Sequence, residues 1–176
     1  MIKLNRCLRK DEIENLIRRL YIRGNEVAKI YKNTPESKEN DIGGFVETYR
    51  YVLHGLFYWS FSASIEFNMD LEKWVDDNLV HQKGEDWDFS KIKLSEEPFE
   101  AFRNSQYLIE RIFEQVEEDL TEYNLDKSIR ANKISKYDKG IIQGYTEILD
   151  IVSQWTKDNH VDVGIDIDEY IKTHLG

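Results

Sequence analysis

The sequence predicts an all-α protein: a single-domain bundle of five to six helices over residues 1–176, with a buried central helix at about residues 45–67. Two observations carry this prediction. Apolar residues recur at steps of three and four, the period of an amphipathic helix, through most of the chain. The run Tyr51–Ile65 contains no Asp, Glu, Lys or Arg, although 33% of all residues are charged. A run this apolar has to be hidden from water, so we expect it to form the centre of the fold.

The bulk composition fits one soluble domain. A chain of 176 residues can bury a sizeable core without a metal or a disulfide, and 40% hydrophobic residues support a folded globule. The single cysteine, Cys7, excludes an internal disulfide and fits a reducing compartment. The first dozen residues lack the apolar run of a secretory signal, and the uncharged run is too short to span a bilayer. We therefore expect a cytoplasmic protein.

The first half of the chain predicts three helices. The apolar spacing from Ile13 to Tyr31 predicts a helix over residues 11–32, with a weak point at Gly24. Residues 33–44 are polar and contain one proline and two glycines, which predicts a loop before the central helix. A third helix is expected at about residues 71–79, followed by an irregular stretch at residues 83–94.

The second half predicts the remaining helices and one connector. Pro98 suits the first turn of a fourth helix, because its missing N–H costs nothing there. A fifth helix is expected at about residues 138–158, and Asp166 with Glu169 forms a capping pair for a short last helix. Residues 161–168 alternate as a strand does, but without a partner strand we expect an extended connector. The core stripe of the fourth helix consists of Phe99, Phe102, Ile109, Phe113, Val116, Leu120 and Tyr123, with Gln106 in the remaining slot.

Charge is distributed unevenly along the chain. The formal net charge is −10, yet residues 1–33 carry nine Lys and Arg against four Asp and Glu, whereas residues 70–123 carry six against sixteen. An acidic total disfavours nucleic acid and anionic membranes as partners and favours a basic protein. The alternative is that the basic and acidic segments complement one another within the fold.

The central helix has a second face that is not obviously core. At 100° per residue, small and polar residues share this face with Tyr51 and Trp59. Either another helix of the same chain covers the face, or it is a docking surface, since aromatic residues are frequent at interface hot spots. The face consists of Thr48, Tyr51, Gly55, Trp59, Ser62 and Glu66.

Two pairs of carboxylates suggest an enzymatic alternative. Glu114-x-x-Glu117 and Glu147-x-x-Asp150 resemble the Glu-x-x-Glu…Glu-x-x-Asp pattern of the all-α, MazG-like nucleotide pyrophosphohydrolases. The resemblance implies that the four carboxylates hold Mg²⁺, which positions a nucleoside triphosphate for attack by water. The helical period opposes this alternative, because it places Glu147 and Asp150 on the solvent side of the fifth helix, away from the core stripe.

The sequence thus favours a small acidic protein that acts by binding another protein, as an inhibitor, an immunity-type factor or an adaptor, without catalysis or a cofactor. The alternative is a Mg²⁺-dependent nucleoside triphosphate pyrophosphohydrolase. A homodimer stays open, and no membrane contact is expected. The candidate partner-binding residues are Tyr51, Trp59, Glu110, Glu114, Glu117 and Glu118.

Overall fold

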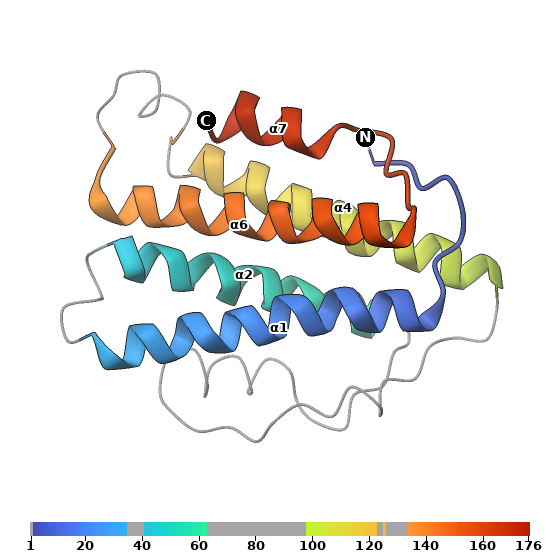
Figure 1. The fold of residues 1–176 in the computed structure, drawn as a ribbon, viewed down its shortest axis with the longest axis horizontal. Helices are drawn as coiled ribbons and strands as arrows, with labels where there is room; N and C mark the ends of the chain where they lie inside the picture. The colour runs from blue at the N-terminus through green and yellow to red at the C-terminus, as the bar shows by residue number, and fades with distance from the viewer. Residues whose placement is uncertain (1, 35–40, 63–97, 123–124, 126–133) are drawn as a thin grey trace.

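The computed structural model describes residues 2–34, 41–62, 98–122, 125 and 134–176 (Figure 1). Within these residues the chain forms helices and no strand, so the all-α prediction is confirmed. The predicted third helix at residues 71–79 and the irregular stretch after it lie outside the described residues. The helices are α1 (Lys10–Asn33), α2 (Asp41–Ser62), α4 (Pro98–Glu122), α6 (Lys136–Asn159) and α7 (Ile167–His174).

The long helices pack along one common direction (Figure 1). Helix α2 returns antiparallel to α1, and α6 runs parallel to α2 in the same layer. Helix α4 lies behind α6 and runs antiparallel to it, while the short α7 lies along the outer edge of α6. The most extensive helix contact is between α2 and α6, so these two helices form the middle of the bundle.

Helix α1 is continuous through Gly24, as predicted for a single helix over residues 11–32. A Cβ atom at this position would lie 3.3 Å from side-chain carbons of both Tyr49 and Leu53 on α2. The glycine therefore allows α1 and α2 to approach closely. The neighbouring turns hold the helix together through buried Leu20 and Val27, which outweigh the roughly 1 kcal/mol helix penalty of one glycine.

Helix α2 begins at Asp41, four residues before the predicted start, so the predicted loop includes residues that are helical. The reason is a close contact with α6. A Cβ at Gly44 would lie 2.0 Å from the backbone oxygen of Tyr137, and one at Gly140 would lie 1.8 Å from that of Asp41. Glycines on both helices permit this backbone contact, and packing then extends α2 into a segment whose local sequence favours a loop.

The core forms around α6, which is buried over a broad part of its circumference. Its fully buried side chains include Tyr145 and Trp155, and the indole of Trp155 donates a 2.9 Å hydrogen bond to the backbone oxygen of Glu12. On α2, Tyr49, Val52 and Leu53 are buried. The side chains of the uncharged run beyond Gly55 lie outside the described ones. Helix α6 buries Gly140, Ile141, Gly144, Tyr145, Ile148, Leu149, Val152, Ser153, Trp155 and Thr156.

The segment after α6 is an extended connector, as predicted. It lies against the N-terminal segment, because the Lys3 amide donates to the Val163 oxygen at 2.9 Å and the Asn5 amide to the Asp162 oxygen at 3.1 Å. The Asp166 carboxylate then accepts a 3.0 Å hydrogen bond from the amide of residue 169, which caps α7. The connector joins the two ends of the chain and positions α7 beside α4 and α6.

Candidate protein-binding surface

Helix α4 presents an acidic face composed of Glu110, Glu114, Glu117 and Glu118. Glu114 lies four residues after Glu110, and Glu117 and Glu118 lie three and four residues after Glu114, so all four are on one side of the helix. Glu114, Glu117 and Glu118 are exposed and Glu110 is half-buried. Arg111 provides the nearest cation, with its Nη1 atom 2.5 Å from Glu114 and 4.0 Å from Glu118. A face with four glutamates and one arginine keeps a net negative charge.

An aromatic residue that the sequence analysis missed extends the acidic face. Tyr107 is 39% exposed, and it lies seven residues, or about two helical turns, before Glu114. It therefore stands on the same side of α4 as the acidic face. The sequence could have identified Tyr107, because it lies outside the core stripe of the fourth helix and aromatic residues on the polar side of a helix are frequent in binding sites.

Helix α7 borders the acidic face at one edge. The Tyr170 hydroxyl donates a 3.5 Å hydrogen bond to Glu117, and its ring packs edge-on against Phe113 with centroids 5.0 Å apart. His174 stacks on the other side of Tyr170, with ring centroids 4.2 Å apart. Glu117 is thus partly committed to α7, whereas Glu114 and Glu118 keep 48% and 60% of their side chains exposed.

Two cations of the basic segment pair with α6, while residues 70–97 of the acidic segment lie outside the described residues. Arg19 pairs with Asp158 at 2.7 Å and Arg23 with Glu147 at 2.6 Å, so these cations of α1 are directed to α6. The ion pair of the acidic face, by contrast, is internal to α4. Arg19 and Arg23 are therefore committed to α6, and in the described part of the chain the acidic face keeps its net negative charge.

The second face of α2 is covered by another helix of the same chain at Thr48. Thr48 is fully buried, and a Cβ at Gly144 of α6 would lie 1.9 Å from its hydroxyl oxygen. Gly55 lines a gap between α2 and α4. Tyr51 is half-buried, and the side chain of Trp59 lies outside the described ones. At Thr48 this face is part of the fold, which leaves α4 as the better described candidate surface.

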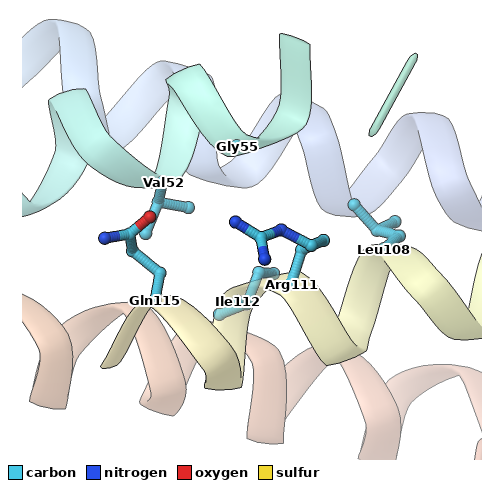
Figure 2. A pocket seen from close by; sticks show the side chains of 6 residues that line it. All are labelled: Val52, Gly55, Leu108, Arg111, Ile112 and Gln115. Atoms are coloured by element: carbon cyan, nitrogen blue, oxygen red, sulfur yellow. The ribbon is translucent and has the colours of Figure 1, made fainter. Parts of the chain in front are cut away.

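The gap between α2 and α4 is narrow (Figure 2). Both the guanidinium of Arg111 and the amide of Gln115 project between the two helices. In the described part of the chain, a Cβ at Gly55 would meet no atom within 4 Å, and the gap has no enclosed volume large enough for a water molecule. This feature is a packing irregularity and lacks the size of a ligand pocket. Its lining consists of Val52, Gly55, Leu108, Arg111, Ile112 and Gln115.

The alternative metal set is not assembled in the structure. The prediction that Glu147 faces solvent on the far side of the fifth helix was wrong, because its carboxylate turns towards α1 and α2. Arg23 donates to it through Nε at 2.6 Å and Nη2 at 3.0 Å, and the Tyr49 hydroxyl donates at 2.5 Å. Burial raises the pKa of Glu147, but the hydrogen bonds from Arg23 and Tyr49 outweigh it and hold the pKa below its usual value.

Asp150 remains exposed, one turn beyond Glu147. Partial burial and the negative charges of Asp168 and Glu147 raise its pKa. The positive charge of Lys157 only partly opposes that rise. Within the residues that the structure describes, no group of three or more Asp, Glu, His or Cys side chains lies close enough to hold a metal ion.

A buried carboxylate on α4 is the polar feature that the sequence analysis missed. Asp119 is 3% exposed and accepts hydrogen bonds from the buried hydroxyl of Tyr145 on α6 and, at 3.0 Å, from Gln115. Burial raises the pKa of Asp119, and the two hydrogen bonds only partly oppose that rise. The sequence could have indicated this burial, because Asp119 lies three residues after Val116, at the edge of the core stripe of the fourth helix. This group links α4 to α6 and so fixes the rotation of the acidic face.

No protein-family model matches this sequence, and neither a curated protein nor a solved structure shows significant similarity to it. In the described part of the chain, every helix is too short or too polar to cross a membrane.

Proposed function

We propose that this protein acts by binding another protein, as an inhibitor, an immunity-type factor or an adaptor, and that a basic partner contacts the acidic face of α4. The observation that carries the proposal is the uncompensated charge of that face. Among the described residues, its glutamates have one cation, Arg111, and that cation is already paired with Glu114. A partner that supplies Lys or Arg could pair with Glu114 and Glu118 without breaking a contact between helices, since the ion pairs of these two glutamates are with Arg111 of the same helix.

Tyr107 supports the proposal with a different kind of contact. Exposed charges mainly accelerate association and select the partner, whereas an aromatic side chain contributes to affinity by burying apolar surface. An exposed tyrosine at the end of a charged face combines both properties on one helix. Asp119 and Tyr145 hold that helix at a fixed rotation, so the surface is presented in one orientation.

The test is capture of a partner from the native cell, with variants of the acidic face as baits. We expect Glu114→Lys/Glu118→Lys to slow association with the captured partner by about tenfold at low salt. The matched control is Asp11→Lys/Glu169→Lys, which changes net charge equally at two exposed carboxylates outside the acidic face. A partner that binds the acidic-face variant and the wild type at equal rates would refute the role of this surface.

A further inference from the structure

We draw no further inference here: the strongest candidate, the outer surface of α1 on which Ile22 and Ile30 are 50% and 48% exposed, is an apolar helix face, and nothing in the part of the chain that the structure describes shows what covers it.

Discussion

Replacing Tyr145 by Phe should destabilise the bundle through the buried carboxylate of Asp119. The substitution keeps the ring and removes one hydroxyl, which leaves the carboxylate with the 3.0 Å hydrogen bond from Gln115 as its side-chain contact. A buried acceptor that loses a donor costs about 1–3 kcal/mol. At pH 7 we therefore expect the free energy of unfolding of Tyr145→Phe to fall by about that amount.

The pH dependence of the destabilisation by Tyr145→Phe shows whether it arises from the negative charge of Asp119. Burial raises the pKa of Asp119 above its unfolded value, so the folded protein takes up this proton first as the pH falls. This group therefore makes folding more favourable as the pH decreases through its folded pKa. Tyr145→Phe removes a hydrogen bond that favours the carboxylate, so its penalty should be largest at neutral pH and shrink in acid.

The assay is urea unfolding followed by far-ultraviolet circular dichroism, at pH 7 and at about pH 4. Asp119→Asn provides the second arm, since its amide oxygen still accepts from Tyr145 and it carries no charge to desolvate. The double variant should show a coupling of about 1 kcal/mol or more with Tyr145→Phe. Additive single effects, or a Tyr145→Phe penalty that is equal at both pH values, would refute the proposed role of the buried charge.

Three further predictions concern the contacts between helices and the enzymatic alternative. Gly144→Ala should lower the free energy of unfolding by about 1–3 kcal/mol, because its Cβ would lie 1.9 Å from the hydroxyl of Thr48. The matched variant Gly55→Ala adds a Cβ that meets no described atom within 4 Å, so it should instead stabilise α2 by up to about 1 kcal/mol in the same unfolding assay. Arg23→Ala should cost about 1 kcal/mol at neutral pH, since both partners of the ion pair are about one-third exposed. The lowered pKa of Glu147 means that the pair stabilises above the unfolded pKa of about 4.3 and loses this effect as the pH falls through the folded value, so the variant and the wild type should converge in acid. Incubation with nucleoside triphosphates and Mg²⁺ or Mn²⁺ should release neither pyrophosphate nor monophosphate; turnover that Glu147→Gln abolishes would contradict this expectation.

The sequence by itself determined the helical class and most helix boundaries, because these depend on local chemistry. The apolar period located α1, α4 and α6 to within two residues, and Pro98 and Asp166 indicated helix starts that the structure contains. The acidic face was also visible in the sequence, since glutamates at steps of three and four share one side of any helix. What it binds stays a prediction.

The tertiary structure decided how much of each helix is buried and which residues meet. Apolar periodicity describes one stripe of a helix, but α6 has neighbours on several sides, so its buried surface extends well beyond that stripe and Glu147 reaches Arg23 and Tyr49. The same reasoning applies to Asp119, whose partner is distant in sequence. A glycine can weaken a helix or admit a neighbour, and only the position of the neighbouring helix, as at Gly24, determines which effect dominates.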